Sequence, residues 1–337
     1  MQHAHHKHAS GVETQPPIVE IMSSLLCSTL GLQAPSPAQS YLARVLTNDR
    51  AGEAARAARK LYVGGEVLGR VLPKPAEQFA RFPDVFEVSD EAVVVRDDPS
   101  WAPDDLITSR SQAVASVLED LRGEGTVPEL AGWRDESFAV RTSFYGPPSL
   151  LIERAAAPLF GATAYGVFLN GFVGDSAATA THLWLGRRAD DKPTWPGLLD
   201  CLAAGGLAAG QMPLAAMQQE CAEEAGIDAA LAARARPVGG VSYTGFSEGW
   251  GLKRDVLFSF DLQLPEDFKP VAADGEMAGF RCTPIDEVCE LVASSEPLFK
   301  PNVGVVIIDF LMRNGFVSPD DPGYLQLLGA LRGAECS

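Results

Sequence analysis

The sequence predicts a two-domain α/β protein, in which a small α+β domain precedes a larger domain of alternating strands and helices. The length of 337 residues is about that of two ordinary domains. Hydrophobic residues account for 46% and charged residues for 21%, which is typical of a globular protein and argues against a disordered or fibrous chain. Strand-like and helix-like segments follow one another through the second half, as they do in α/β folds.

We expect three segments along the chain: a tail or leader over residues 1–35, the α+β domain over 36–155 and the larger domain over 156–337. Residues 21–43 are uncharged and rich in serine, but no arginine precedes Arg44, whereas organelle transit peptides are rich in arginine. The sequence therefore favours a cytoplasmic protein, with a plastid or another organelle as the alternative.

The small domain is predicted to combine strands with two helical segments. Two β-prone runs flank Gly64 and Gly65, and glycine supplies the positive φ that a tight hairpin turn needs. Apolar residues between 110 and 122 recur at helical spacing. The expected elements are a helical region around 40–60, strands at 60–63, 66–71, 85–88 and 92–95, and a helix at 110–122.

The larger domain is predicted to alternate between strands and helices. Pro213 and Gly226 bracket one helix, because proline is favoured in a first turn and glycine just after the last. The expected strands are 164–169, 182–188, 238–244 and 254–262, and the expected helices are 213–225, 284–293 and 301–314.

The charge balance excludes several classes of partner. Acidic residues outnumber basic ones by 44 to 27, which gives a formal charge of −17 and a pI near 4.7. Such a surface repels nucleic-acid backbones and anionic membranes, so we expect neither as a partner. A small molecule that carries phosphate needs a local reversal of this field, for which a divalent cation is the usual means. Nothing in the composition sets the oligomeric state.

Cysteine and histidine usage argues against two kinds of site. The six cysteines form no C-x-x-C pair, so we expect free thiols and no structural zinc site. Four of the five histidines lie within the first eight residues. His182 is left as the base of a nucleophilic triad, and no G-x-S-x-G elbow lies near it.

The helix predicted at 213–225 is the most informative segment. Glu220, Glu223 and Glu224 stand three and four positions apart and so share one face. Three anions at the negative end of a helix repel one another and oppose the helix dipole. A divalent ion would remove that penalty, and Mg²⁺ or Mn²⁺ suits such oxygen ligands. A separate apolar stripe is predicted to be buried: Leu214, Met217, Cys221 and Ala225.

Around this helix the sequence resembles the Nudix hydrolases, whose signature is G-x5-E-x7-R-E-U-x-E-E-x-G-U, where U is a bulky apolar residue. The matching positions are Gly205, Glu220, Glu223, Glu224 and Gly226, and Ile227 closes the motif. Gln211 stands where the first glutamate is expected, Gln219 replaces the arginine, and Cys221 takes the first apolar position. The flanking glycines favour this interpretation over an ordinary solvated helix face.

The resemblance extends over about residues 60–332 and includes the stretches RFPDVFEV, LIERAAAPLFGATAYGVFLNGFV, TWPGLLD and FKPNVGVVIIDFLMRNGF. These resemble a subfamily of two-domain Nudix proteins related to the N-terminal half of fungal thiamine pyrophosphokinase, with plant plastid members. The resemblance implies a Nudix α/β/α sandwich with a mixed sheet, preceded by the small α+β domain. It also implies metal-dependent hydrolysis of thiamine diphosphate, or of its oxidised or damaged analogues, to the monophosphate and phosphate.

The resemblance also implies roles for individual residues. Glu220, Glu223 and Glu224 are implied to bind Mg²⁺ or Mn²⁺, with Glu220 alternatively acting as general base. Glu276, from a later loop, is the candidate fourth ligand or water-activating base, with an ordinary turn residue as the alternative. Gln219 can orient the neighbouring glutamate only by an uncharged hydrogen bond, which is weaker than that of the family's arginine, so we expect lower activity.

Six residues are candidates for contact with the substrate. Arg187 and Arg188 end the strand before the motif, where guanidinium groups either grip phosphate or simply form a solvated strand end. Four aromatic residues flank the predicted site and offer rings on which a thiazolium-type cation can stack, although each also fits an ordinary core or loop position. They are Trp195, Tyr243, Phe246 and Trp250.

Two alternative functions stay open. A binding module would retain the diphosphate pocket but would have lost turnover through Gln211 and Gln219. An isoprenoid diphosphate isomerase would need a catalytic cysteine near the site, for which Cys201 is the candidate. Release of phosphate in the presence of Mg²⁺ distinguishes the hydrolase from both.

Overall fold

The structure is a computed structural model that describes residues 35–192, 194–247, 250–273 and 275–333. The leader predicted over residues 1–35 lies outside these residues except for its last position. Internal contacts divide the chain into Met1–Ser36 and Pro37–Ser337, and the fold below is that of the second unit. Within the described residues, none of the helices combines the length and the apolar character that crossing a membrane requires.

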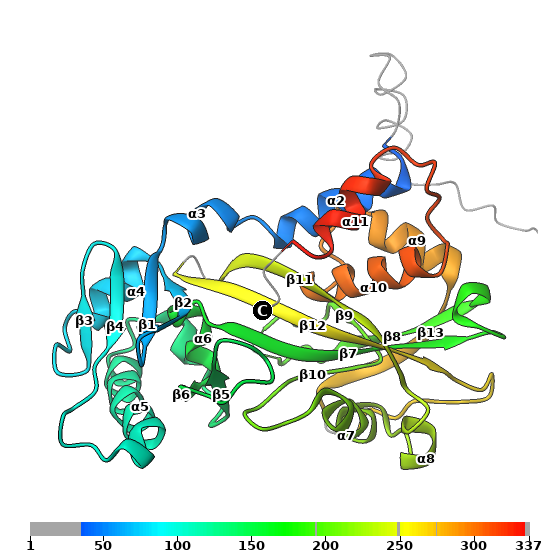
Figure 1. The fold of residues 1–337 in the computed structure, drawn as a ribbon. Coiled ribbons are helices and arrows are strands. Elements are labelled where there is room, and N and C mark those ends of the chain that lie inside the picture. Colours follow the sequence, from blue (N-terminus) through cyan, green and yellow to red (C-terminus); the bar gives the residue numbers. More distant parts are fainter. Residues whose placement is uncertain (1–34, 193, 248–249, 274, 334–337) are drawn as a thin grey trace, which may run out of the picture. The chain divides into compact units, whose positions relative to one another are not determined.

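A four-stranded sheet with the order β2-β1-β4-β3 forms the centre of the small domain, which we define as the region from β1 to α6 (Figure 1). The predicted hairpin is confirmed: β1 (Arg59–Val63) turns through Gly64 and Gly65, both with positive φ, into β2 (Glu66–Val71). The apolar residues of the predicted helix share one core with this sheet. The other elements are β3 (Phe86–Val88), β4 (Ala92–Val95), α4 (Pro73–Phe79) and α5 (Leu106–Glu124).

A second hairpin, which the sequence analysis does not predict, follows α5. Its strands β5 (Ser137–Val140) and β6 (Leu150–Glu153) pair in antiparallel fashion. The short helices η2 (Pro128–Gly132), η3 (Arg154–Ala156) and α6 (Ala157–Phe160) lead into it and out of it. Because α6 is buried in the core of the small domain and is followed directly by β7, it joins the two domains.

The larger domain is organised around a mixed seven-stranded sheet. Its continuous path is β11-β12-β7-β8-β13, with β10 paired to β7 and β9 paired to β8. β7 and β12 run parallel, and the other pairings are antiparallel. The strands are β7 (Thr163–Val173), β8 (His182–Arg188), β9 (Leu199–Asp200), β10 (Ala203–Gly206), β11 (Arg236–Ser247), β12 (Gly251–Gln263) and β13 (Met277–Pro284).

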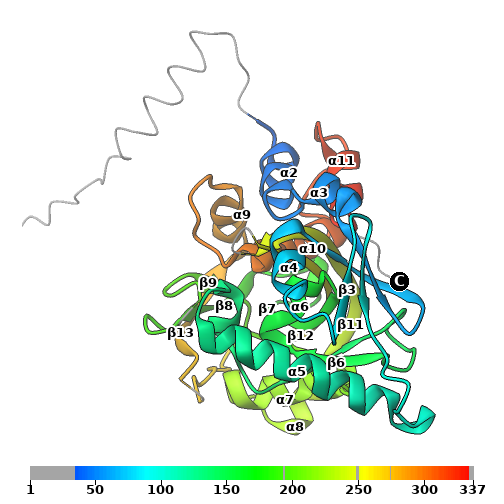
Figure 2. The same ribbon diagram turned by 90° about the vertical axis from the view of Figure 1, so that its left-hand side faces the viewer.

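Helices cover both faces of this sheet (Figure 1, Figure 2). Side chains along β7 alternate between the faces, so that Phe168 and Phe172 share a core with α10, whereas Val167 and Leu169 share a core with α7. One face carries α7 (Pro213–Ala225) and α8 (Ala229–Ala232), and the other carries α2 (Pro37–Asn48), α9 (Ile285–Ala293), α10 (Pro301–Arg313) and α11 (Tyr324–Ala330). The result is the α/β/α sandwich with a mixed sheet that the sequence resemblance implies.

The helical region expected at 40–60 is divided into α2 and α3 (Gly52–Ala57). Tyr41 and Val45 of α2 pack in the core formed with α9, α10 and α11, and not on the sheet of the small domain. The guanidinium Nε of Arg44 donates to the carbonyl of Val292 across 2.7 Å and holds the helix there. The larger domain therefore includes a helix that precedes the small domain in the sequence.

Candidate active site

A cavity of about 850 Å³ is lined by residues of both domains. The small domain contributes residues next to the β5–β6 hairpin, among them Glu136 and Arg154. The larger domain contributes parts of β7, β10 and β12 and one face of α7. Glu220, Glu223 and Glu224, which the sequence places on one helix face, all line this cavity.

The helix α7 begins at Pro213, as predicted, and is followed by Gly226 in the left-handed conformation. The predicted buried stripe is confirmed for its last three members, Met217, Cys221 and Ala225. It is wrong for Leu214, which is 46% exposed. The buried side of the helix is rotated toward Ala216 and Glu224, and this rotation turns Leu214 outward.

Gly205, the first residue of the motif, is needed because Glu220 lies directly against it. A Cβ atom at residue 205 would overlap the carboxylate of Glu220, and one at Gly206 would come within 2.8 Å of the guanidinium of Arg154. These two glycines of β10 therefore let a carboxylate and a guanidinium lie close to the backbone.

Burial makes two of the glutamates reluctant to ionise. The pKa of Glu220 is raised to about 7, first by burial and then by the negative charges of Glu223 and Glu276. Burial also raises the pKa of Glu224 well above its usual range, although Glu224 accepts a hydrogen bond of 2.8 Å from the amide of Ala204. The surroundings of these two carboxyl groups therefore stabilise their ionised forms poorly.

The two glutamines at the degenerate motif positions are linked to each other. Gln211 accepts a hydrogen bond of 3.0 Å from the amide of Ala208, and its side-chain nitrogen lies 3.5 Å from Oε1 of Gln219. Gln219 in turn donates to Glu223 across 3.0 Å. Gln219 thus orients the glutamate four positions on and not the adjacent Glu220, because residues four apart are neighbours on the helix surface, whereas adjacent side chains point about 100° apart.

Glu276 lines the cavity and has a basic partner there. Lys192 forms an ion pair with it at 2.7 Å. Burial alone raises the pKa of Glu276, but the hydrogen bond and the charge of Lys192 outweigh this effect and lower it. Glu276 is therefore a charged group close to Glu220, and Lys192 engages its Oε1.

Comparisons with known proteins identify the family. Residues 167–303 match the family model described as NUDIX domain, and residues 40–164 match a domain of unknown function, DUF4743. Nudix hydrolase 20, chloroplastic, from Arabidopsis thaliana is 40% identical over 276 residues, which cover 81% of this chain and 72% of that protein. The chain belongs to the Nudix hydrolase family.

The chain is also similar to two further proteins. Nudix hydrolase 24, chloroplastic, from the same plant is 44% identical over 68% of this chain and 60% of its own length. An uncharacterized protein of Saccharomyces cerevisiae is 31% identical over 65% of this chain and 66% of its own length. Nudix hydrolases cleave phosphorus-containing acid anhydrides, and the protein is a hydrolase of that class.

The carboxylates suit a Nudix metal site by their chemistry but are not preassembled as one. Carboxylate oxygens are the ligands that Mg²⁺ and Mn²⁺ prefer, and a cation would offset the effects of burial and of neighbouring negative charges that raise the pKa of Glu220. In the part of the chain that the structure describes, no three His, Cys, Asp or Glu side chains form a group that could hold an ion. Glu223 accepts from Gln219 and Glu276 pairs with Lys192, in each case through Oε1.

The cavity of about 850 Å³ described above is called the Nudix cavity from here on, and four of the six predicted substrate contacts do not line it. Arg187 forms a surface ion pair, because it points away from the side of β8 on which Arg188 is buried. Tyr243 is a buried core residue whose hydroxyl donates to a carboxylate. Phe246 and Trp250 flank the turn between β11 and β12, where Trp250 packs on the core of the small domain.

Arg188 and Trp195 do line the Nudix cavity, and the arginine supports the tryptophan. Arg188 is buried, pairs with Asp200 at 2.9 Å and donates to the carbonyls of Thr194 and Trp195 at 2.8 and 3.0 Å. Trp195 has a φ of +54°, which is unfavourable for a residue with a side chain, and it is 47% exposed. Arg188 therefore holds the backbone of a strained loop whose tryptophan lines the cavity.

The position of Cys201 does not support the isomerase alternative. Its side chain is buried in the core shared with α10 and does not line the cavity. Burial raises the pKa of its thiol well above the usual range. The thiol therefore has no contact with the space that a substrate would occupy.

The cavity is also lined by cations for which the sequence predicted no role, among them Arg154, Lys192 and Lys300. Arg154 pairs with Glu136 at 2.8 Å, and Lys300 lies 3.3 Å from the carboxylate of the buried Asp200. Both residues lie far from the motif in the sequence. The available signal was their place in the stretches LIERAAAPLFG and FKPN, which belong to the family resemblance.

Proposed function

We propose that this protein hydrolyses thiamine diphosphate, or oxidised and damaged analogues of it, to the monophosphate and inorganic phosphate. The observation that carries the proposal is the face of α7 on which Glu220, Glu223 and Glu224 line a large cavity in a Nudix domain. The choice of thiamine compounds rests on the sequence resemblance to the subfamily related to fungal thiamine pyrophosphokinase.

We assign Glu220, Glu223 and Glu224 as the ligands of Mg²⁺ or Mn²⁺, with Glu276 as a fourth ligand or as the base. When bound, the metal neutralises phosphate oxygens and polarises the bond that is cleaved. A carboxyl group whose pKa is about 7 is well matched to general base catalysis at neutral pH, which makes Glu220 the other candidate for the base.

The tryptophan at the cavity supports a substrate that carries a flat ring. The backbone carbonyl of Trp195, which lines the cavity, accepts a hydrogen bond from Arg188. A thiazolium cation stacked on the tryptophan ring would gain about 0.5–2 kcal/mol. Because the whole chain is acidic, it also favours a cationic ring over an anionic one.

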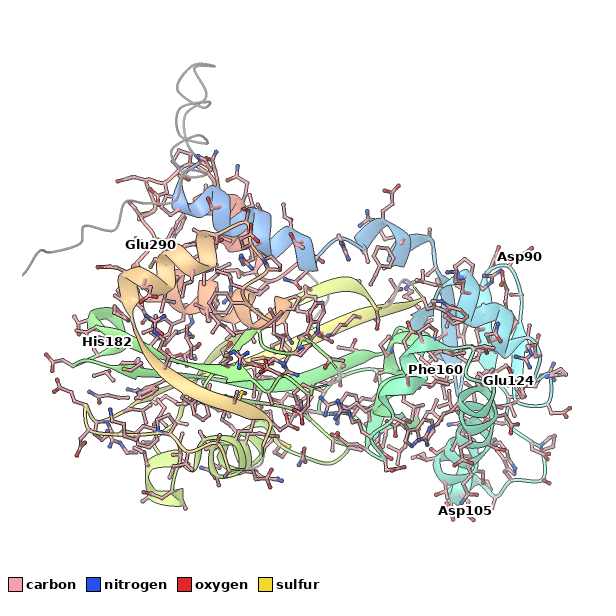
Figure 3. The ribbon with its side chains drawn as sticks, turned by 180° about the vertical axis from the view of Figure 1, so that it is seen from behind. Asp90, Asp105, Glu124, Phe160, His182 and Glu290 are labelled. Carbon is pink, nitrogen blue, oxygen red and sulfur yellow. The ribbon has the colours of Figure 1, made fainter. Side chains whose placement is uncertain are left out.

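The experiment is a screen for phosphate release from thiamine, nucleoside, sugar and coenzyme A diphosphates, with and without Mg²⁺. We expect release from thiamine diphosphate or an oxidised form of it, only with the metal, and its loss in Glu224→Gln. Glu290→Gln is the matched control, because Glu290 is exposed on α9, on the opposite face of the sheet (Figure 3).

Two results would count against the proposal. Release from another diphosphate class alone would overturn the thiamine assignment and leave the Nudix chemistry in place. Binding of thiamine diphosphate with no release from any diphosphate would favour the binding module, in which Gln219 holds Glu223 as the structure shows.

We also propose the plastid, or another organelle, as the location to test first. The two plant relatives are named chloroplastic, and this favours the organelle alternative over the cytoplasm that the lack of early arginines suggests. The test is the distribution in plant cells of a fluorescent protein fused after residue 58, compared with the same fusion lacking residues 1–35. Cytoplasmic fluorescence from both fusions would contradict the proposal.

A further inference from the structure

Arg154 reaches the Nudix site from the small domain. It directly follows β6, and its guanidinium lines the cavity, lying over Gly206 and 5.5 Å from the centre of the Phe138 ring. Its Nη1 pairs with Glu136 at 2.8 Å, and 41% of the side chain is exposed. The guanidinium is therefore positioned by three neighbours and still faces open space.

Backbone hydrogen bonds fix this position relative to the Nudix motif. The amide of Arg154 donates to the carbonyl of Glu136 at 2.8 Å, which ties the end of β6 to the start of β5. The amide of Ala209, inside the motif, donates to the carbonyl of Ser137 at 2.8 Å. The hairpin and the motif loop are thus joined, so Arg154 is held beside Gly206, next to the Gly205 against which Glu220 lies.

Arg154 differs from three other cations of the cavity, Arg188, Lys192 and Lys300, in what it offers a ligand. Arg188, Lys192 and Lys300 each pair with a carboxylate of the larger domain. In Arg154, Glu136 engages one terminal nitrogen, and across the described residues Nε and Nη2 have no hydrogen-bond partner. A guanidinium with two open N–H groups on one edge matches the paired oxygens of a phosphate.

We propose that Arg154 binds a phosphate group of the diphosphate substrate, so that the small domain forms one wall of the Nudix site. The inference rests on the proposed function for its substrate class. In this role Arg154 supplies a positive charge to the cavity of a protein whose motif carries Gln219 in place of the family's arginine. It also gives the region matched to a domain of unknown function a defined task.

The test compares Arg154→Gln and Arg154→Lys with Arg81→Gln in the full-length protein. Arg81 is a matched control, because it lies in the small domain and forms a similarly exposed ion pair, with Glu124 at the end of α5 (Figure 3). The measurements are KM for thiamine diphosphate and the dissociation constants of two probes, inorganic pyrophosphate and phosphate-free thiamine.

For Arg154→Gln we expect KM and the pyrophosphate dissociation constant to rise about 10- to 100-fold, since a charge-assisted contact is lost. Arg154→Lys should fall between this variant and the wild type, because lysine keeps the charge but not the paired N–H groups. The affinity for thiamine should stay unchanged in both variants, and Arg81→Gln should match the wild type in every measurement.

Wild-type pyrophosphate affinity in Arg154→Gln would overturn the inference. An equal loss of affinity for thiamine would overturn it as well, because it would show a general disturbance of the cavity. If Arg154→Gln does not fold, Arg154→Lys decides the question by the ratio of its pyrophosphate and thiamine affinities. If the wild type releases no phosphate, the proposed function fails, while pyrophosphate binding measured by calorimetry still tests Arg154.

Discussion

The two faces of the central sheet bury acidic residues in opposite ways. On the α10 face, Asp309 is completely buried, and Arg313 and Arg332 each contact its carboxylate at 2.7 Å. On the α7 face, Glu224 is nearly as buried, but the hydrogen bond it receives comes from an uncharged backbone amide. Glu220 lies close by and has a raised pKa.

The difference separates acids that stabilise the fold from acids that are available to a ligand. A buried carboxylate without a cation costs several kcal/mol, so a protein retains one only where another gain offsets the cost. On the α10 face that gain is the pairing with arginines inside the molecule. On the α7 face we expect it to come from a bound cation, in keeping with the tendency of functional sites to break local rules.

Removal of the paired acid should have the largest effect on stability. Asp309→Ala leaves Arg313 and Arg332 without their shared partner, and we expect the free energy of unfolding to fall by about 3–5 kcal/mol. Urea unfolding followed by circular dichroism measures the change. A loss below about 1 kcal/mol would show that the arginines find other partners and would weaken the contrast between the faces.

Replacement of Glu224, whose hydrogen-bond donor is a backbone amide, should affect activity and not stability. Glu224→Gln keeps an oxygen that can accept from the amide of Ala204 and removes the cost of burying a charge. We expect the free energy of unfolding to be unchanged or higher, and the rate of phosphate release to fall about 100-fold or more. A stability loss like that of Asp309→Ala, with activity retained, would make Glu224 a structural residue.

The pH dependence of stability gives a smaller but more specific signal. The pKa of Glu220 is about 7 in the folded protein, above its ordinary value of 4.5, so the folded state binds more protons between these values. Without metal, stability should therefore fall as the pH rises from about 5 to 8, and Glu220→Gln should reduce the slope. Thermal unfolding in EDTA at several pH values tests this, and equal slopes in the two proteins would contradict it.

The same group should make metal binding pH-dependent, because a proton must leave before the cation binds. We expect the affinity for Mg²⁺ to rise with pH up to about 7, by at most about tenfold per pH unit, and to level off above it. Calorimetric titration at pH 6, 7 and 8 measures the trend. An affinity that does not vary with pH would exclude Glu220 as a ligand.

The smallest effect is expected at residue 219, where glutamine replaces the positively charged arginine of the motif. Gln219→Arg would place a charge-assisted hydrogen bond where Gln219 now donates to Glu223, and we expect turnover to rise about two- to tenfold. The measurement is kcat for phosphate release at saturating Mg²⁺. An unchanged or lower kcat would show that residue 219 does not orient the carboxylates for catalysis.

Local patterns were sufficient for the elements whose signals lie within one stretch of sequence. Helical spacing and a proline–glycine pair predicted α7, and two glycines predicted the β1–β2 hairpin. The four-residue strands β5, β6 and β10 were missed, although β4, which has the same length, was predicted from its run of β-branched valines. The paired β13 was also missed, since its polar and apolar residues do not alternate clearly.

Partners that are remote in the sequence explain what the site predictions lacked. The three glutamates were found because helix geometry fixes their relation, whereas Arg154 and Lys300 reach the cavity only through the tertiary fold. The opposite orientations of Arg187 and Arg188 depend on which side of β8 is covered. Tyr243 is near the motif in the sequence, and this suggested contact with the substrate. In the fold its side chain is buried in the core and does not line the cavity.

The position of α2 has a consequence for dividing this protein into fragments. A fragment that begins at residue 156 would lack the helix that carries Tyr41 and Val45, and it would expose the apolar surface of α10 and α11 that they cover. A fragment that ends at residue 155 would carry that helix without its binding surface. Separate expression of the Nudix half therefore needs residues 37–48 to be supplied with it, as a second chain or through a linker.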